Sequence, residues 1–230
     1  MVYNGGTMKQ KTILFDINET VLNLSVLAPK FERVFADQAT LPLWFSMLLH
    51  SSTVTAITQV KSSFASLAGD MLDNIAVRKG VTLSPADRED ILKTFAHLPA
   101  HADIKSALTQ LSENGYQTVA FSNSSLDLIT QQISNAGLSD YFDHVFSVEA
   151  TASFKPDPKV YHWIAQQLQQ PIDQLRLVAT HDWDTHGALS AGMQAAYINR
   201  SDAPYHPQYK QPSLKADDMK TLVEKIIAAE

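Results

Sequence analysis

The stretch Thr12–Thr20 reads TILFDINET, an apolar run that ends abruptly at an acidic side chain. A short apolar run of this kind is typical of a strand that is buried on both faces in a parallel sheet. Asp16 follows the predicted strand Thr12–Phe15 directly, at the edge where open α/β sheets bind their ligands. An acid in this position is suited to act as a nucleophile or as a metal ligand.

Similar runs farther along the chain are expected to complete the sheet. They lie at Thr118–Phe121, His144–Val148, Leu175–Ala179 and Ala195–Ile198. Helical patterns are found at Ile104–Glu113, Leu126–Ala136, Pro158–Gln169, Thr185–Ala191 and Lys215–Ala228, and a proline-containing loop is expected at Ser201–Ser213. Strands that alternate with helices in this way predict an α/β fold with a doubly wound parallel sheet.

The interval from Asn23 to Leu98 breaks this alternation because it has helical patterns and no convincing strand. The expected helices lie at Pro29–Ala36, Pro42–Leu49, Val54–Gly80 and Pro85–Phe95. We therefore expect a helical cap at residues 23–98, inserted after the first strand, and an α/β core at residues 8–22 and 99–230. Residues Met1–Thr7 resemble an expression remnant or a loose extension before a natural start at Met8.

The composition and net charge of the chain exclude several classes of function. The 230 residues are 45% hydrophobic and 18% charged, which is typical of an ordinary globular protein. A net charge of −6 disfavours binding to nucleic acid or to an anionic membrane surface. Because cysteine is absent, disulfides, a thiolate nucleophile and cysteine-ligated metals are excluded. With no apolar run of membrane-spanning length and no recognisable signal peptide, a cytoplasmic location is expected.

Chemically active side chains also follow the later strands. Ser122 and Asn123 come after the second run, Lys155 precedes a predicted helix, and His181 and Asp184 follow the fourth run. Each of these residues alone also suits a turn, a helix cap or a solvated surface. Because carboxyl ends of parallel strands meet at one edge of the sheet, their shared position favours an active site.

The order of these motifs resembles the haloacid dehalogenase superfamily, and in particular its (S)-2-haloacid dehalogenases. The motifs are FDxxxT at Phe15–Thr20, a helical insertion, SN at Ser122–Asn123, KPxxxVY at Lys155–Tyr161 and WDxxGAxxAG at Trp183–Gly192. Each motif alone is weakly specific, but the whole order is fairly specific, and it spans the chain from Ile13 to Arg200.

The resemblance implies a role for each matching residue. Asp16 is the nucleophile, Thr20 supports its carboxylate, and Lys155 neutralises the negative charge. Asp184 orients or activates the hydrolytic water. These roles are completed by Ser122 near the nucleophile or reacting group, Asn123 near the leaving group, and Tyr161 at the family spacing after the lysine.

Asn18 separates two branches of the superfamily. Phosphatases usually carry a second aspartate at this place, because an alkoxide leaving group needs a proton from a general acid. Asn18 cannot supply that proton, whereas a departing halide needs none. Thr180 stands where the fourth motif usually has an acid that binds Mg²⁺. The resemblance therefore implies carbon–halogen cleavage without a metal or other cofactor, although Asp182 or Asp184 could still complete a magnesium site.

The implied reaction has two displacement steps. Asp16 attacks the carbon that carries the halogen and forms an ester, and water then attacks the ester carbonyl and frees a 2-hydroxy acid. The substrate expected is a small carboxylic acid, with Asn18, Tyr161 and His181 among the residues around it. His181 replaces the asparagine of well-characterised dehalogenases.

The start of the insertion departs from the family. The dehalogenases carry an arginine after a tryptophan to grip the substrate, whereas this chain has Trp44-Phe45. Phe45 offers no charge, so Trp44 and Phe45 could form an apolar wall for a different or larger substrate, or simply part of the cap core.

Two other functions stay open at this point. A Mg²⁺-dependent phosphatase acting on a small phosphate ester is the alternative enzyme, and a catalytically silent binding module is the alternative without chemistry. Relatives of this kind commonly form homodimers, and the sequence leaves the oligomeric state open.

Overall fold

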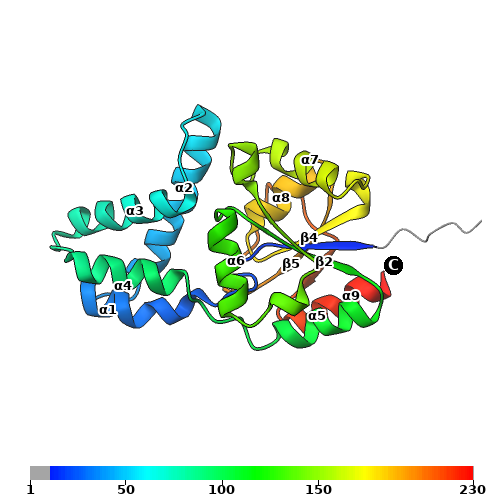
Figure 1. Cartoon of the computed structure of the whole chain (residues 1–230), viewed down its shortest axis with the longest axis horizontal. Coiled ribbons are helices and arrows are strands. Elements are labelled where there is room, and N and C mark those ends of the chain that lie inside the picture. Colours follow the sequence, from blue (N-terminus) through cyan, green and yellow to red (C-terminus); the bar gives the residue numbers. More distant parts are fainter. Residues whose placement is uncertain (1–10, 230) are drawn as a thin grey trace, which may run out of the picture.

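The computed structural model describes residues 11–229, and a parallel sheet forms its centre (Figure 1). In this described part of the chain the strand order is β3-β2-β1-β4-β5-β6. The strands are β1 Thr12–Phe15, β2 Gln117–Ser122, β3 His144–Ser147, β4 Leu175–Ala179, β5 Gln194–Ile198 and β6 Leu214–Ala216. All neighbouring pairs are parallel. The prediction of a doubly wound α/β fold is confirmed.

The register of the central strand brings the reactive side chains to one edge. Phe15 is paired with Ala120 of β2 and with Val178 of β4. Asp16 directly follows Phe15, and its backbone N–H still donates to the carbonyl of Val178 at 3.0 Å. Every residue of β1 is buried, because helices cover both faces of the sheet.

Helices pack on both sides of this sheet. Figure 1 shows α5 (Ile104–Glu113) beside α9 (Met219–Ala228) below the sheet, and α7 (Pro158–Gln167) with α8 (Asp182–Ser190) above it. The helix α6 (Leu126–Asn135) packs against β3. The loops after β1, β2 and β4 therefore meet on the side of the sheet that faces the inserted helices.

The insertion after β1 is helical and lies beyond the carboxyl ends of the strands (Figure 1). Its helices are α1 Ala28–Phe35, α2 Thr40–Thr58, α3 Phe64–Lys79 and α4 Pro85–Phe95. They enclose the indole of Trp44, which is fully buried against Phe31 and Phe95. The Trp44 Nε1–H donates to the carbonyl of Ala68 at 3.0 Å, which ties α2 to α3.

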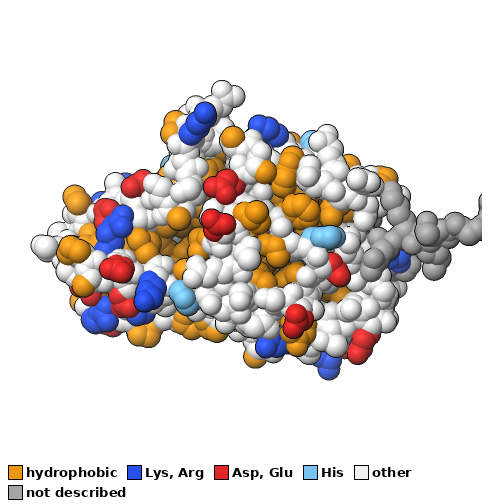
Figure 2. Space-filling view, viewed as in Figure 1, with side chains coloured by type: hydrophobic (Ala, Val, Ile, Leu, Met, Phe, Trp, Pro, Cys, Tyr) orange, Lys and Arg blue, Asp and Glu red, His pale blue; other side chains and the backbone are white. Residues whose placement is uncertain are grey.

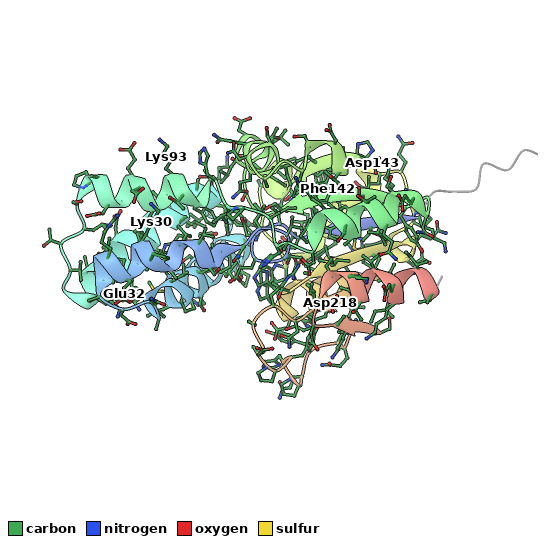
Figure 3. All side chains as sticks on the ribbon, turned by 90° about the horizontal axis from the view of Figure 1, so that it is seen from below. Lys30, Glu32, Lys93, Phe142, Asp143 and Asp218 are labelled. Carbon is green, nitrogen blue, oxygen red and sulfur yellow. The ribbon has the colours of Figure 1, made fainter. Side chains whose placement is uncertain are left out.

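Ion pairs join the outer cap helices. Figures 1 and 3 show α1 and α4 side by side. Figure 3 labels Lys30 on α1 and Lys93 on α4. Lys30 Nζ lies 2.7 Å from Asp90 Oδ2 across this contact, and Arg33 lies 3.0 Å from the same oxygen. Figure 2 shows the resulting mixture of basic and acidic side chains over these helices. Exposed pairs of this kind contribute little stability individually.

The two chain segments that connect the insertion to the core run next to each other. Leu22 and Ala100 form an antiparallel bridge. On either side of it, Asn23 N–H donates to the carbonyl of Pro99 at 2.8 Å and His101 N–H donates to that of Val21 at 2.9 Å. Both connections thus leave the core at one place.

The structure corrects the expected division of the second and third cap helices. We predicted a break between Leu49 and Val54, but α2 continues to Thr58. The hydroxyl groups in this interval bond within the helix, as Thr53 Oγ1 does to the carbonyl of Leu49 at 3.0 Å. The real break follows the left-handed residue Gln59, and Ser63 then caps α3.

The C-terminal part differs from the prediction in two places. The strand β6 was not predicted, because three residues that include Lys215 give no recognisable alternation; α9 accordingly begins at Met219 rather than Lys215. In addition, α8 begins at Asp182 instead of Thr185. The expected extension Met1–Thr7 and start at Met8 lie outside the described residues. Within residues 11–229, no helix is both long and apolar enough to span a membrane.

Candidate active site

A buried cluster of one ammonium and two carboxylates lies at the carboxyl ends of the central strands. Lys155 Nζ is 3.3 Å from Asp16 Oδ1 and 2.9 Å from Asp184 Oδ2. The three side chains come from the loop after β1, the segment before α7 and the first turn of α8. Residues distant in sequence thus meet because their strands are neighbours in the sheet.

The surroundings of Asp16 keep it ionised. Burial would raise the pKa of this carboxyl, but Lys155, His181 and Thr20 outweigh burial and lower the pKa to about 2. Thr20 Oγ1 donates to Asp16 Oδ2 at 2.7 Å. The same hydroxyl oxygen accepts the backbone N–H of Thr180 at 2.9 Å, so it links the loop after β1 to the end of β4.

Lys155 is held by contacts at both ends of the residue. Its ammonium also donates to the carbonyl of Phe121 at 2.8 Å, and its backbone N–H donates to Asn123 Oδ1 at 2.9 Å. Burial works against the charged form, but Asp184 and Asp16 together raise the pKa of Lys155. The Lys155–Pro156 peptide bond is cis. The amide of Asn123 therefore fixes the backbone from which the lysine extends.

Asp184 is completely buried and shared between two donors. Tyr161 Oη donates to Asp184 Oδ1 at 2.6 Å, while Lys155 occupies Oδ2. Burial raises the pKa of Asp184 further than the attraction of Lys155 lowers it. The spacing requires Gly187, because a Cβ there would lie 2.7 Å from the Tyr161 hydroxyl. A carboxylate with a raised pKa is better able to accept a proton.

His181 faces the nucleophile candidate from the other side. Its Nδ1 lies 3.3 Å from Asp16 Oδ2, an ion-pair distance without the alignment of a good hydrogen bond. Its Nε2 lies 2.7 Å from Glu19 Oε2. Burial would lower the pKa of His181, but Asp16 and Glu19 outweigh burial and raise the pKa to about 10. The side chain is therefore an imidazolium at neutral pH.

Two of the predicted site residues, Ser122 and Asn18, form hydrogen bonds with the loop after β2 and with α6. Ser122 Oγ accepts the backbone N–H of Ser124 at 3.1 Å, which stabilises the turn after β2. Asn18 donates to Ser124 Oγ at 3.3 Å and accepts from Gln132 Nε2 at 3.3 Å. Both residues are buried, so they support the loops around Asp16.

Aromatic side chains of α2 and α8 lie next to His181. The Phe45 ring centroid lies 6.0 Å from that of His181, and the Trp183 ring of α8 stacks at 5.1 Å. A cavity of about 430 Å³ opens beside them, with Phe45, Trp183, Leu49 and Glu19 among its lining residues. Trp44, in contrast, has no exposed surface, so it would meet a substrate only if the cap rearranged.

The oxygen donors near Asp16 do not suit Mg²⁺, which requires several oxygen ligands in octahedral geometry. The Asp16 and Asp184 carboxylates both face the Lys155 ammonium. Asp182 points away, since its Oδ2 accepts the backbone N–H of His206 at 3.1 Å. Thr180 supplies a hydroxyl that accepts the backbone N–H of Arg200 at 3.2 Å. Across residues 11–229, no three His, Cys, Asp or Glu side chains form a group that could hold a metal ion.

Sequence reasoning missed Glu19 as a site residue. The only available signal was an acid between Asn18 and Thr20 in the turn after the first strand, where a solvent-facing side chain was equally reasonable. Glu19 adopts a left-handed conformation with φ of 65°. Its contact with His181 joins residues far apart in the chain and could not be read from local sequence.

Comparison with known proteins gives a consistent result. A family model for haloacid dehalogenase-like hydrolases matches residues 10–178. The (S)-2-haloacid dehalogenase H-109 of Pseudomonas putida is 26% identical over 209 residues, covering 90% of this chain and 93% of the relative. The (S)-2-haloacid dehalogenase of Pseudomonas sp. strain YL is 24% identical over 216 residues, covering 93% of each chain.

A solved structure has the same fold. The L-2-haloacid dehalogenase from Xanthobacter autotrophicus, with chloropropionic acid covalently bound, superposes with a TM-score of 0.87 at 21% identity. The match covers 94% of this chain and 98% of the other. Together with the family model, which spans most of the core and the whole insertion, these observations establish that the chain belongs to the haloacid dehalogenase-like hydrolases.

Proposed function

We propose that this protein is a 2-haloacid dehalogenase that needs no cofactor and releases halide from small 2-haloalkanoic acids. The observation that carries the proposal is the buried cluster in which Lys155 Nζ contacts both Asp16 and Asp184. It holds an ionised nucleophile and a carboxylate of raised pKa against one ammonium. The similarity to (S)-2-haloacid dehalogenases over 90% of the chain supports the substrate class.

In the first step, an oxygen of Asp16 attacks the carbon that bears the halogen, and the halide leaves with the bonding electron pair. An aspartyl ester results. The halide needs no proton, which is consistent with Asn18 being engaged by Ser124 and Gln132 rather than offering an acid. Lys155 keeps Asp16 ionised before the attack. Asn123 contributes by holding the Lys155 backbone.

In the second step, water attacks the Cγ of the Asp16 ester and gives a proton to Asp184. The raised pKa of Asp184 favours this transfer. Tyr161 orients the carboxylate through its 2.6 Å hydrogen bond. When the tetrahedral intermediate breaks down, the departing alkoxide takes that proton to give the 2-hydroxy acid. Asp16 is left as a carboxylic acid, and it releases its proton to solvent to restore the ionised nucleophile.

Residues 23–98 would serve as a cap over this reaction, on a core of residues 8–22 and 99–230. The adjacent connections at Leu22 and Ala100 support this division. A cap that excludes bulk water strengthens the electrostatic interactions among Asp16, Lys155 and Asp184. Phe45 of the cap and Trp183 of the core both line the neighbouring cavity of about 430 Å³.

The test is a measurement of halide release from a panel of 2-chloro and 2-bromo acids, by ion chromatography with excess EDTA. Release with the (S)-enantiomers is expected, together with an ester adduct on Asp16 by mass spectrometry. The Asp16→Asn variant is the matched control and should release none. Absence of release across the panel, or equal release by Asp16→Asn, would refute the proposal. Turnover of p-nitrophenyl phosphate only after Mg²⁺ addition would favour a phosphatase instead.

A further inference from the structure

His181 lies between two carboxylates, and this arrangement is the least expected feature of the site. Nδ1 is 3.3 Å from Asp16 Oδ2, and Nε2 is 2.7 Å from Glu19 Oε2. A neutral imidazole would present a lone pair to one of these carboxylates, whereas an imidazolium can donate to both. The geometry alone thus favours the protonated ring.

The two oxygens of Asp16 are held differently. Oδ2 accepts a short hydrogen bond of 2.7 Å from Thr20 and also faces His181. Oδ1 contacts Lys155 at the longer distance of 3.3 Å. The less restrained Oδ1 is therefore the better nucleophile, and Oδ2 becomes the carbonyl oxygen of the ester.

We propose that His181 and Thr20 form an oxyanion hole for hydrolysis of the Asp16 ester, an inference that rests on the dehalogenase function proposed above. Water forms a bond to Cγ, its proton passes to Asp184, and the carbonyl π electrons move onto Oδ2. Thr20 Oγ1–H and His181 Nδ1–H stabilise that negative charge. The pair then re-forms the carbonyl as the Cγ–Oδ1 bond breaks. Donors aimed at developing charge lower the barrier more than they stabilise the reactant.

Glu19 is the positioning residue in this arrangement. Its carboxylate holds the imidazole by Nε2, with Nδ1 3.3 Å from Asp16 Oδ2, a contact that can tighten when charge develops on that oxygen. The ring is further fixed by stacking on Trp183 at 5.1 Å. Glu19 maintains this contact from a left-handed backbone conformation that glycine adopts more easily. We infer that the carboxylate at this position serves to keep His181 oriented and charged.

The proposal gives opposite expectations for the two chemical steps. A cation facing Asp16 stabilises its charge and so restrains the attack on the substrate carbon. The same cation accelerates hydrolysis, because the negative charge then develops on Oδ2. Loss of the imidazolium should leave ester formation unchanged or faster while slowing ester hydrolysis. General damage to the site would slow both steps.

The experiment is a rapid-quench single turnover with (S)-2-bromopropionate, with halide release and the Asp16 ester followed separately. His181→Phe retains a ring between Phe45 and Trp183 but removes both nitrogens. Its ester hydrolysis should slow by roughly a hundredfold, the usual effect of removing one oxyanion donor. The ester should accumulate without slower formation. His97→Phe changes an exposed histidine of another segment and should match the wild type.

A second variant separates a shift of α8 from loss of the donor. His181→Asn retains a neutral amide donor, so its hydrolysis rate should fall between those of the wild type and His181→Phe. Equal slowing of both steps in His181→Phe, unchanged ester hydrolysis in that variant, or an Asn variant no faster than Phe would overturn the proposal. If the wild type forms no ester and releases no halide, the dehalogenase function itself is refuted.

Discussion

Tyr161 donates its phenol hydroxyl to Asp184 Oδ1 at 2.6 Å, while both side chains are fully buried. This contact orients the carboxylate that would accept a proton from water. In Tyr161→Phe, we expect a loss of about 1 kcal/mol in unfolding free energy, the usual contribution of a buried hydrogen bond. Ester hydrolysis should slow about tenfold, which corresponds to about 1.4 kcal/mol. Urea denaturation and single-turnover kinetics measure both effects; unchanged hydrolysis would show that Asp184 needs no such orientation.

Lys155 neutralises two buried carboxylates at once, so its removal should be severe. Lys155→Met retains the length of the side chain but removes the ammonium that Asp16 and Asp184 share. Breaking a buried ion pair typically costs about 3–5 kcal/mol. We expect a clearly lower melting temperature and no measurable halide release. The control variant is Lys159→Met. It removes an exposed lysine that donates to the carbonyl of Thr151. Similar melting temperatures for the two variants would contradict the assignment.

The hydroxyl of Thr20 forms hydrogen bonds with both Asp16 and Thr180, so variants with and without this hydroxyl can be compared. Thr20→Val removes the donor to Asp16 and leaves the backbone N–H of Thr180 without its acceptor. The cost of such an unpaired buried group is about 1–3 kcal/mol. Thr20→Ser keeps the hydroxyl and should retain most of the stability and of the ester hydrolysis rate. If Ser and Val behaved alike, the methyl group rather than the hydroxyl would be the important feature.

The stability of the protein should depend on pH through His181. The charged groups that face it are Asp16 and Glu19, and the rings of Phe45 and Trp183 pack beside it from α2 and α8. Its pKa rises from 6.5 to about 10 on folding. The stabilisation is therefore fully present below pH 6.5 and is lost as pH rises through about 10.

Urea denaturation of the wild type and His181→Phe between pH 6 and 10 checks this dependence. The difference in unfolding free energy between them should be largest at pH 6 and shrink toward pH 10. Asp16 titrates in the opposite range: its contribution is present above its ordinary pKa of 3.8 and is lost as pH falls through about 2. A difference between the two proteins that stayed constant with pH would mean that His181 is neutral when folded.

Phe45 occupies the position where the family resemblance implies an arginine, and its ring lies beside that of His181. The ring centroids of Phe45 and His181 are 6.0 Å apart. Phe45→Arg should therefore destabilise the protein by like-charge repulsion and should not improve binding of the haloacid. In the His181→Asn background, the same change should lower the free energy of unfolding by a smaller amount. The coupling energy between the two positions should be about 1 kcal/mol or more. Additive effects in this double-mutant cycle would argue against the repulsion.

The sequence predicts the sheet and the charged centre of the site for a definite reason. Asp16 follows a strand that is apolar throughout, and parallel strands bring their carboxyl ends together. The relation between Lys155 and Asp184 then follows from their places after later strands. Glu19 and His181 are different, because a contact between residues 162 positions apart depends on how the loops fold over the sheet. The extent of α2 was obscured by serine and threonine side chains that bond within the helix.

The adjacent connections at Leu22 and Ala100 also have a consequence for folding. β1 pairs with β2 across a sequence separation of 105 residues, whereas the inserted helices contact one another over smaller separations, such as 24 residues between Trp44 and Ala68. Forming β1–β2 pairing directly requires closure of a very long loop, which is entropically unfavourable. Local assembly of the insertion shortens that effective loop to the distance between its two connections. Early folding of the cap would therefore bring β1 and β2 closer together and speed their pairing.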